Sequence, residues 1–581
     1  MLEKVYSFIR GNIIFLVILA VSAFLRFIFI NQNPPSLNWD EVSHGYNAYS
    51  IITTGRDEWG VMLPNIFRAY GDYKLPVYIY STALSVLLFG LNEFAVRLPS
   101  AISGVITVIF SYFLVYELFK DKAYNVNNKL LASVASLLVA VEPWSLFLSR
   151  GAFEANLALT FIIGGVYFFI LLGRRSKYLV LSSILFGLSV WTYNSARIFV
   201  PLILAILIYF YKKELVDCYK KNKATFLLSF IITLTFFVPM FLQLASPVGR
   251  ARYGKVALIN EGAVAEINEL RRTSSFSPMV SRLFYNKGTF FIQRFVVNYF
   301  SHFSPLFLFI EGGSHYQFSI PNHGLVYFVN FVFLVIGLVS ILKKRIRSSR
   351  LVVCWLLLSP IPSSLTSEAP HVLRSIIMLP VPMILSSLGF VKMVSWVKSR
   401  LKGYSHVSQV TKGVIVVYVF ILFVSLSQYL NLYFKDYRNE YSWSWQYGHK
   451  QLVAYVRERY CDYEKIIVTK KFGEPHEFFL FYWPWDPQKY LSDSNLNRFY
   501  QSNWYWVDRF DKFYFVNDWD IPREEWDYFE LESGEKFRCE DKRCLLVGSV
   551  ESFPKGWRKL KTIQFLNGDP AFVVFDNQQD E

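Results

Sequence analysis

Long apolar runs are the feature that most restricts how this chain can fold. Eleven runs have about the length that a helix needs to cross the hydrocarbon core of a bilayer. Hydrophobic residues make up 53% of the 581 residues, in runs too long for an ordinary soluble enzyme. The sequence therefore predicts a polytopic α-helical membrane protein. The predicted crossings lie near residues 11–31, 98–119, 130–149, 153–172, 178–194, 196–211, 224–244, 323–342, 351–367, 374–396 and 413–431.

The basic residues between these runs predict the orientation of the chain. The formal net charge is +16, but Lys and Arg cluster in short loops rather than along one soluble face, so nucleic acid is not an expected partner. With eleven crossings, four basic loops fall on one side, which the positive-inside rule makes cytoplasmic. These loops are 174–177, 212–223, 343–350 and 398–412. We expect a multi-pass protein of the plasma membrane, with a retained N-terminal anchor and a cytoplasmic N-terminus.

The apolar stretch 76–91 would upset this orientation if it were a twelfth crossing. It is short and follows Lys74-Leu75, so we expect a juxtamembrane or re-entrant helix at the outer interface. Three segments then face outward. They are the first outer loop, residues 31–97, the long outer loop, residues 245–322, and the tail. The predicted domains are a transmembrane domain, residues 1–435, and an extracytoplasmic domain, residues 436–581.

The tail has the pattern of a soluble α/β domain. Charge and aromatic content rise from about Asp436, and β-like runs occur at 465–469, 512–516, 544–550 and 571–575. A helix-like stretch precedes the first of these runs, at residues 446–460. The length suits one small domain. A disulfide between Cys539 and Cys544 is one option for this segment, and free thiols are the other.

Two carboxylates, Asp40 and Glu41, stand where the chain leaves the first span. Ionised groups at that depth need solvent, a partner or a chemical role. One interpretation is that they take part in chemistry at the outer face. The other is that they cap a juxtamembrane helix, because Asp and Glu favour helix starts. This segment alone leaves both interpretations open.

Further polar residues gather near the outer ends of later spans. His371 and Arg374 are three residues apart, so in a helical turn both would face a common ligand. A phosphate suits an arginine fork beside a helix start, whereas the alternative is that Arg374 reaches to the interface and His371 caps. Glu142 lies inside an apolar run and needs a partner. An ion pair with Arg150 or Arg197 and a role in substrate binding are the two alternatives.

Several classes of protein lack their signatures in this sequence. There is no P-loop, no Cys-x-x-Cys and no His-Glu-x-x-His, so ATP-driven transport and zinc proteolysis have no support. A secondary transporter would carry polar groups near mid-membrane on paired broken helices. In this chain the polar groups gather at the outer interface instead.

The outer residues form a pattern that resembles the GT-C glycosyltransferases. It consists of Trp39-Asp40-Glu41 after the first span, a lysine followed closely by proline, the stretch 92–100, and His371-x-x-Arg374. The resemblance is to the dolichyl-phosphate-mannose protein mannosyltransferases of family 39 and to the lipid A aminoarabinose transferases. It extends from about residue 10 to residue 430 and is strongest at 38–119. It implies the GT-C fold, with about eleven transmembrane helices and juxtamembrane helices in the first outer loop.

The resemblance also implies roles for particular residues. Asp40 would be the general base, and Glu41 would support it or help to position the acceptor. Lys74 would bind the donor phosphate, and His371 and Arg374 are the other candidates for that role. The further candidates for substrate binding are His44, Glu142, Arg150 and Arg197.

The chain departs from the aminoarabinose transferases at two places. Lys74-Leu75-Pro76 replaces their Lys-Pro-Pro, and Val42-Ser43-His44 stands where they tend to carry an arginine after the acidic pair. The identity of the substrate therefore does not follow from the resemblance.

The reaction expected from these residues is a single inverting displacement. A phosphate leaving an anomeric carbon needs charge stabilisation, which Lys74 and Arg374 would supply, and the incoming hydroxyl needs a base, which would be Asp40. We expect transfer of a hexose, with mannose as the first candidate, from a polyprenyl-phosphate donor to a protein, glycan or glycolipid outside. The alternatives are transfer of aminoarabinose or another pentose to a glycolipid and, in a different class, a lipid-linked glycan flippase or a membrane scaffold. The residues require no cofactor. Whether Asp40 and an outer histidine bind a divalent ion is left open by the sequence.

Overall fold

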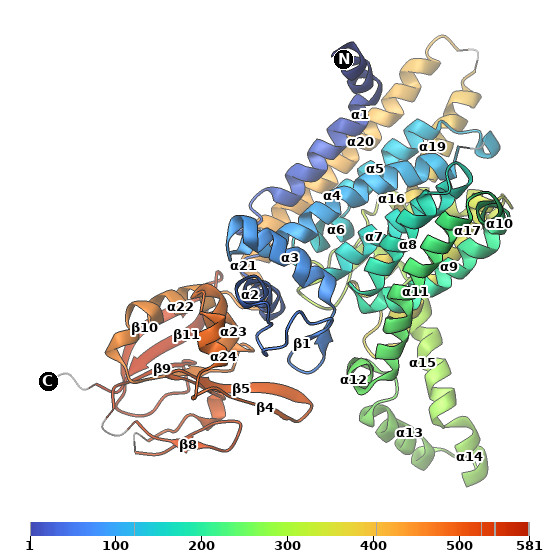
Figure 1. The fold of residues 1–581 in the computed structure, drawn as a ribbon. Helices are drawn as coiled ribbons and strands as arrows, with labels where there is room; N and C mark the ends of the chain where they lie inside the picture. Colours follow the sequence, from blue (N-terminus) through green and yellow to red (C-terminus); the bar gives the residue numbers. More distant parts are fainter. Residues whose placement is uncertain (1, 121, 403, 525, 540–541, 579–581) are drawn as a thin grey trace. The chain divides into compact units, whose positions relative to one another are not determined.

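The computed structural model describes residues 2–120, 122–402, 404–524, 526–539 and 542–578 (Figure 1). The chain divides into two compact units. Unit 1 contains residues 1–28 and 100–430, and unit 2 contains residues 29–99 and 431–581. The first outer loop therefore belongs to the same unit as the tail. The domain boundary predicted at residue 436 stays a prediction.

Unit 1 is helical. Each of the eleven predicted runs contains at least part of a helix. The helices are α1 (Leu2–Phe27), α4 (Glu93–Leu118, which begins in unit 2), α5 (Asn128–Val141), α6 (Pro143–Leu148), α7 (Glu154–Ile170), α8 (Tyr178–Val190), α9 (Asn194–Phe210), α10 (Lys212–Lys221), α11 (Lys223–Ala245), α12 (Pro247–Val256), α13 (Glu261–Thr273), α14 (Pro278–Phe284), α15 (Lys287–Ser301), α16 (Asn330–Leu342), α17 (Arg347–Leu358), α18 (Ile361–Ser364), α19 (Val381–Arg400) and α20 (Val407–Asn431).

Length and hydropathy support a multi-pass membrane protein without fixing the number of crossings. Among the described residues, five helices are long and apolar enough to span a bilayer, namely α4, α7, α11, α19 and α20. The bent pair α9 and α10 would make a sixth, and other apolar helices are shorter. The predicted number of eleven therefore stays a prediction.

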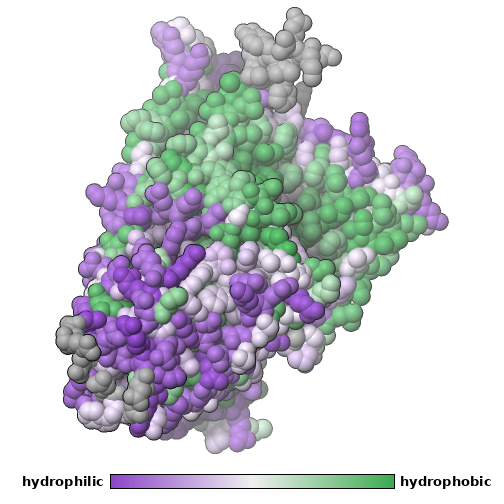
Figure 2. All heavy atoms as spheres, turned by 60° about the vertical axis from the view of Figure 1, so that its left-hand side comes forward, coloured by the Kyte–Doolittle hydropathy of each residue, from purple (hydrophilic) through white to green (hydrophobic). Residues whose placement is uncertain are grey.

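The surface of the helices supports the same conclusion. Large apolar side chains such as Phe230, Ile231 and Leu242 on α11 are exposed. The space-filling view shows a broad hydrophobic surface over the helices, whereas the surface of the C-terminal sheet domain is largely hydrophilic (Figure 2). Since exposed apolar area of this extent is costly in water, lipid is the solvent that suits these helices.

Glycines bring two of these helices into close contact. A Cβ on Gly337 of α16 would lie 1.9 Å from the backbone oxygen of Leu385, and one on Gly389 of α19 would lie 1.8 Å from that of Phe333. Only residues without a Cβ allow the two backbones to approach so closely, as is common where helices pack within a membrane.

Unit 2 contains a mixed sheet whose strand order is β10-β11-β9-β3-β6-β5-β4. Its central strand β3 pairs in parallel with β6 and β9, and the outer strands pair antiparallel. The strands are β3 (Lys465–Thr469), β4 (Asn497–Gln501), β5 (Trp504–Phe510), β6 (Phe513–Val516), β9 (Cys544–Gly548), β10 (Arg558–Gln564) and β11 (Pro570–Asp576). The predicted α/β tail is thus confirmed, including each of the four predicted β-like runs.

Helices and a hairpin complete this sheet domain. Helix α22 (His449–Glu458) occupies most of the predicted helical stretch 446–460, and α23 (Pro475–Tyr482) and α24 (Pro487–Leu491) follow β3. The hairpin of β7 (Phe529–Glu530) and β8 (Lys536–Phe537) packs with the sheet in one apolar cluster. The Cys539–Cys544 disulfide is present, so this option of the two is confirmed.

The first outer loop packs onto the tail through helix α2 (Trp39–Thr54), and α3 (Pro76–Phe89) is the helix expected in the stretch 76–91. A Cβ on Gly45 of α2 would lie 2.4 Å from the ring of Phe481 on α23, so glycine allows the two helices to touch. Strands β1 (Phe67–Arg68) and β2 (Tyr73–Lys74) pair within the loop. The placement of α3 at a membrane interface stays a prediction.

Candidate active site

Asp40 lies in the first turn of α2 and keeps much of its side chain accessible. The side chain is 53% exposed, and its Oδ1 lies 3.0 Å from Nζ of Lys74. The ammonium group of Lys74 is 8% exposed and also donates to the backbone oxygen of Asp40 at 3.2 Å. The resemblance assigned both residues to one site, and in the structure they lie side by side in unit 2. An accessible carboxylate is thus held next to a buried cation.

Glu41 is buried and makes structural contacts. It completes a capping box with Asn38, in which each residue's side chain accepts from the other's backbone N–H. It also accepts two hydrogen bonds from Arg97, from Nε and from the terminal nitrogen, both at 3.0 Å. The capping interpretation therefore describes Glu41, whereas Asp40 is the carboxylate that remains accessible.

Arg97 fixes the loop around Glu41, and the sequence did not single out this contact. Its guanidinium is fully buried and donates to the backbone oxygens of Ile30 and Pro34 at 2.9 Å. A charged group without exposure needs a partner for its charge and for each donor. Arg97 therefore ties the entry of the first outer loop to helix α2. His44, one turn beyond Asp40, is buried and faces Tyr78 edge-on, with the ring centres 5.1 Å apart.

Unit 1 holds the remaining predicted site residues, and it brings two of them to one cavity. Arg197 and Arg374 both line a cavity of about 150 Å³. Helix α9 begins beside the cavity at Asn194, and helix N-termini favour anions. The rest of the lining is mostly apolar or small and comprises Tyr193, Ser195, Ile198, Leu244, Gly249, Val256, Pro362, Leu365 and Thr366.

The arginines of this cavity are held by neighbouring polar groups. Arg374 donates to Thr366 Oγ1 at 2.8 Å and to the carboxylate of Glu368 at 3.0 Å. Glu368 is 70% exposed, so solvent screens its pairing with Arg374. Arg197 donates from Nε to the backbone oxygen of Val190 at 3.0 Å. The cavity therefore combines two cations with apolar walls.

His371 does not line this cavity in the described part of the chain. Its Nδ1 accepts from the backbone N–H of Arg374 at 3.3 Å, which is the capping contact that the sequence left as an alternative. Its ring lies 5.1 Å from that of Phe318. The pairing of the two side chains around one ligand stays a prediction.

Glu142 and Arg150 form hydrogen bonds to other segments of unit 1. Glu142 lies at the break between α5 and α6 and accepts from the N–H of Tyr327 at 2.7 Å and from the side-chain amide of Asn330. Arg150 donates to the backbone oxygens of Leu25 and Ile28. Buried polar groups in helical membrane proteins often join helices in this way. Their predicted role in substrate binding has no direct test in these contacts.

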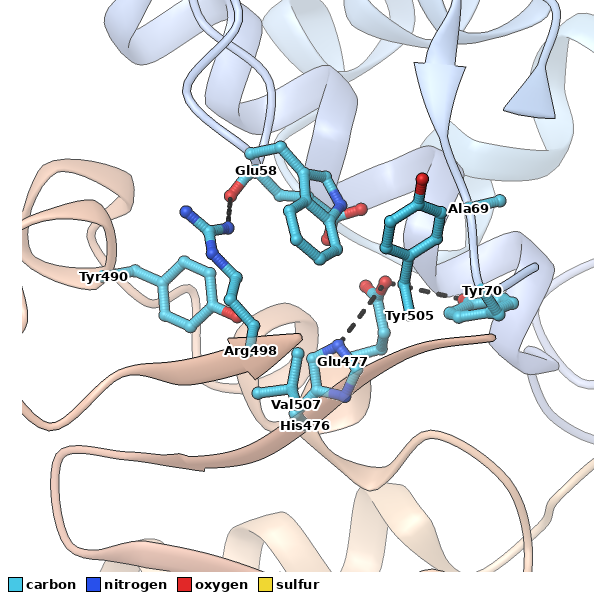
Figure 3. A pocket seen from close by; sticks show the side chains of 10 residues that line it. Glu58, Ala69, Tyr70, His476, Glu477, Tyr490, Arg498, Tyr505 and Val507 are labelled. Carbon is cyan, nitrogen blue, oxygen red and sulfur yellow. Dashed lines mark hydrogen bonds and ion pairs between the residues drawn. The ribbon is translucent and has the colours of Figure 1, made fainter. Parts of the chain in front are cut away.

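A cluster of buried acidic residues lies in unit 2 and consists of Glu58 from the first outer loop and Glu474 and Glu477 from the tail. Figure 3 shows the carboxyl group of Glu477 between Tyr70 and His476, with Glu58 facing the same small cavity. Burial and the neighbouring Glu58 raise the pKa of Glu477 well above its ordinary value, and burial raises the pKa of Glu58. Burial also raises the pKa of Glu474 to about 7. Sequence reasoning missed this cluster because its members are far apart in the chain.

Replacing Glu477 by glutamine should make stability less dependent on pH above pH 6.5. A carboxyl whose pKa is raised by folding holds a proton that the unfolded chain has released, so stability falls as pH rises towards the folded pKa. His476, whose pKa burial lowers to about 3, is present in both proteins, so its own titration cancels in the comparison. Below the folded pKa, the slope of unfolding free energy with pH should become shallower by up to about 1.4 kcal/mol per pH unit. Thermal unfolding between pH 6.5 and 9 measures it, with the exposed Glu551→Gln as control.

An unchanged slope in Glu477→Gln would mean that Glu477 is ionised in the folded protein. A glutamine retains the size of the side chain and a donor for Glu58, so a loss of packing does not account for a difference between the two variants.

Known proteins resemble this chain in sequence and fold. Residues 74–242 match the sequence model of the dolichyl-phosphate-mannose-protein mannosyltransferase family. A comparison with curated proteins finds no significant match. Apo ArnT from Cupriavidus metallidurans has a TM-score of 0.52 at 12% identity over 97% of each chain, and ArnT bound to undecaprenyl phosphate has 0.51 at 11% over 98% of each. An Archaeoglobus fulgidus oligosaccharyltransferase tethered with an acceptor peptide has 0.49 at 14%, over 81% of this chain and 63% of that one.

The likeness to ArnT shows the fold of the chain. The match to ArnT extends over nearly the whole length of both chains and includes the helical unit and the tail. The chain therefore has the GT-C fold, as the resemblance of its outer residues implied. The family match includes Lys74, Glu142, Arg150 and Arg197, and it ends before His371 and Arg374.

Proposed function

We propose that this protein is an inverting glycosyltransferase that uses a sugar on a polyprenyl phosphate as its donor. The observation that carries the proposal is the accessible carboxylate of Asp40 at the start of α2, 3.0 Å from the buried Lys74, in a chain with the GT-C fold. We place the reaction at the outer face of the membrane, where the positive-inside rule puts the loop that carries Asp40.

The proposed reaction is one displacement at the anomeric carbon. Asp40 takes the proton of the acceptor hydroxyl as its oxygen forms the new glycosidic bond. The bond between the anomeric carbon and the phosphate oxygen breaks, and its electron pair leaves with the polyprenyl phosphate. Attack opposite to the leaving group inverts the configuration. Lys74 stabilises negative charge that develops nearby, because a preorganised cation acts without reorganising solvent.

The cavity of unit 1 has the composition that a lipid phosphate needs. Arg197, Arg374 and the start of α9 supply groups that bind anions. Apolar residues such as Ile198 and Leu244 suit a polyprenyl chain. Known structures give independent support to this class of ligand, since one ArnT structure was solved with undecaprenyl phosphate. We propose that the headgroup phosphate of the lipid binds in this cavity.

The sugar and the acceptor are open to direct measurement. Mannose is our first candidate, in line with the family whose model matches, and aminoarabinose is the alternative that the sequence resemblance implies. The purified protein would be incubated with radiolabelled polyprenyl-phosphate mannose, glucose and aminoarabinose and with peptide, glycan and glycolipid acceptors. Transfer from one donor with inverted configuration supports the proposal. Movement of the lipid-linked sugar across vesicles without transfer would identify a flippase instead.

Replacing Arg374 by alanine should raise the KM for the donor about 10- to 100-fold with a smaller effect on kcat. A hydrogen-bonded ion pair with a phosphate contributes about 1.5–3 kcal/mol, which corresponds to that factor. Steady-state kinetics with varied donor would measure the change. Glu368→Gln is the matched variant, because it removes the exposed carboxylate that pairs with Arg374. It should leave the KM equal or lower, and a rise in both variants would contradict phosphate binding at Arg374.

A further inference from the structure

The residue before Asp40 is held by the tail. Trp39 is the first residue of α2, and its backbone N–H donates to Oε1 of Gln446 at 2.7 Å. The first N–H groups of a helix have no partner within the helix, so this bond satisfies one of them. Gln446 in turn donates from its amide nitrogen to the backbone oxygen of Phe472. One side chain of the tail thus connects the start of α2 to the loop after β3.

Gln446 has an unusual backbone conformation for its residue type. Its φ angle is 55°, in the left-handed region that residues with a side chain seldom adopt, and the side chain is buried. Such a conformation persists only where the surrounding structure enforces it, and it often occurs near functional groups. The conformation directs the side-chain amide of Gln446 towards Trp39.

Gly473 forms the surface on which the ring of Trp39 rests. A Cβ on this glycine would lie 2.1 Å from Cε3 of Trp39 and 2.6 Å from the amide nitrogen of Gln446. The φ angle of Gly473 is 105°, which also favours glycine. Any other residue here would push the ring of Trp39 away.

A residue of the first outer loop, Tyr70, binds the backbone oxygen of Trp39. The hydroxyl of Tyr70 donates at 2.8 Å to the backbone oxygen of Trp39, which belongs to the peptide group that leads into Asp40. Tyr70 also stacks against Trp504 of β5, with ring centres 5.8 Å apart. Trp504 is fixed by a 2.6 Å hydrogen bond from Nε1 to Glu474. Both backbone polar groups of Trp39 are therefore bonded to buried side chains.

Asp40 itself depends on this support, because its side chain is half exposed and short. The position of its carboxylate follows from the backbone at the start of α2 and from the contact with Lys74. Displacements of about 1 Å at a reacting group can lower a rate about 100-fold. A small displacement of Trp39 would therefore also displace the carboxylate of Asp40.

We propose that Gln446 and Gly473 of the tail are positioning residues, which hold Trp39 and thereby place the carboxylate of Asp40 for catalysis. This inference rests on the proposed function of Asp40 as a base. It assigns the tail a part in the reaction itself, beyond the selection of an acceptor.

The test compares Gly473→Ala with Gly568→Ala. Both glycines have positive φ angles, but a Cβ on Gly568 would have no atom within 4 Å among the described residues. The two variants therefore share the backbone strain and differ in the push on Trp39. We expect Gly473→Ala to lower kcat about 10- to 100-fold with the KM for the donor within 2-fold, and Gly568→Ala to retain kcat. Equal kcat in the two variants would overturn the proposal.

A second pair of variants removes the hydrogen bonds without adding bulk. Gln446→Met keeps the length of the side chain but loses both the acceptor for Trp39 and the donor for Phe472, and Gln501→Met changes an exposed glutamine of β4. We expect Gln446→Met to lower kcat and to move the acidic limb of the pH–kcat profile, because the surroundings of the Asp40 carboxylate change. A fall in kcat with an unmoved acidic limb would indicate a general loss of folded protein and would contradict positioning.

Labelling of position 40 separates this proposal from the proposed function. In an Asp40→Cys protein that also carries Cys461→Ser, the rate of maleimide labelling reports the surroundings of residue 40 without any substrate. Adding Gly473→Ala should change this rate at least 3-fold, and adding Gly568→Ala should leave it unchanged. If this difference appears but no donor is turned over, the positioning holds and the proposed function fails. If turnover occurs and labelling is equal in both variants, the positioning fails alone.

Discussion

Asp40→Asn is expected to lower kcat by about 10²- to 10⁴-fold, the usual contribution of a general base. The amide has the same shape but cannot accept the proton of the acceptor hydroxyl. The donor should still bind, so the KM for the donor should change little. Initial rates of sugar transfer by the purified variant and the wild type would measure the effect. The expected loss is large because the half-exposed Asp40 is the carboxylate of the acidic pair that is not committed to Arg97.

Two comparisons make this test specific. Asp569→Asn changes an exposed aspartate in the turn before β11 and should retain full activity. Asp40→Glu keeps the charge but extends the side chain by one methylene, so it should recover only part of the rate. Full turnover by Asp40→Asn would show that another group accepts the proton, and the proposed mechanism would then be wrong.

Arg97→Met is expected to destabilise the protein by about 3–5 kcal/mol, the usual cost of breaking a buried ion pair from one side. The variant leaves the Glu41 carboxylate buried and deprives the backbone oxygens of Ile30 and Pro34 of their donor. Glu41→Gln should also destabilise the protein, because it leaves the buried guanidinium of Arg97 without its carboxylate. The double variant should lose less than the sum of the two single losses, because no unpaired charge remains. Thermal or denaturant unfolding in detergent provides the measurement.

The pair of Arg294 and Glu266 is the matched control. These side chains are bonded at 2.8 Å, but both are about half exposed. Solvent screens such pairs, so Arg294→Met should cost less than about 1 kcal/mol. Equal losses in the two pairs would mean that Arg97 and Glu41 are not shielded from water.

The parts of this fold that follow from local patterns were predictable. Apolar length gave the helical membrane unit, and short runs of β-branched and aromatic residues gave strands such as β3 and β11. Strands β4 and β5 were missed because charged and polar residues interrupt their aromatic ones, and β10 was missed because most of its residues are charged or polar. No local sequence pattern indicated that residues 29–99 belong to the same compact unit as the tail. This grouping depends on contacts between residues some 400 positions apart, such as Trp39 and Gln446.

The candidate site was predictable to a similar degree. The resemblance assigned Asp40 and Lys74 to one site, and they do lie together, whereas their chemical roles stay a prediction. That Glu41 is buried against Arg97 while Asp40 stays accessible could not be predicted, because neighbouring carboxylates look alike in a sequence. The arginines Arg197 and Arg374 were named separately, and only the fold joins them in one cavity. The cluster around Glu477 has no sequence signal, since burial, which raises its pKa, is a property of the folded chain.

The inclusion of the first outer loop in the tail's compact unit sets a rule for building chimeras. A hybrid enzyme that exchanges residues 436–581 alone would separate Trp39 from Gln446 and Gly45 from Phe481. Grafts that carry residues 29–99 together with the tail would keep these partners from one parent. We therefore expect acceptor preference and turnover to be retained only when residues 29–99 and the tail come from the same parent. Recombination between relatives that separates the two segments should lower activity.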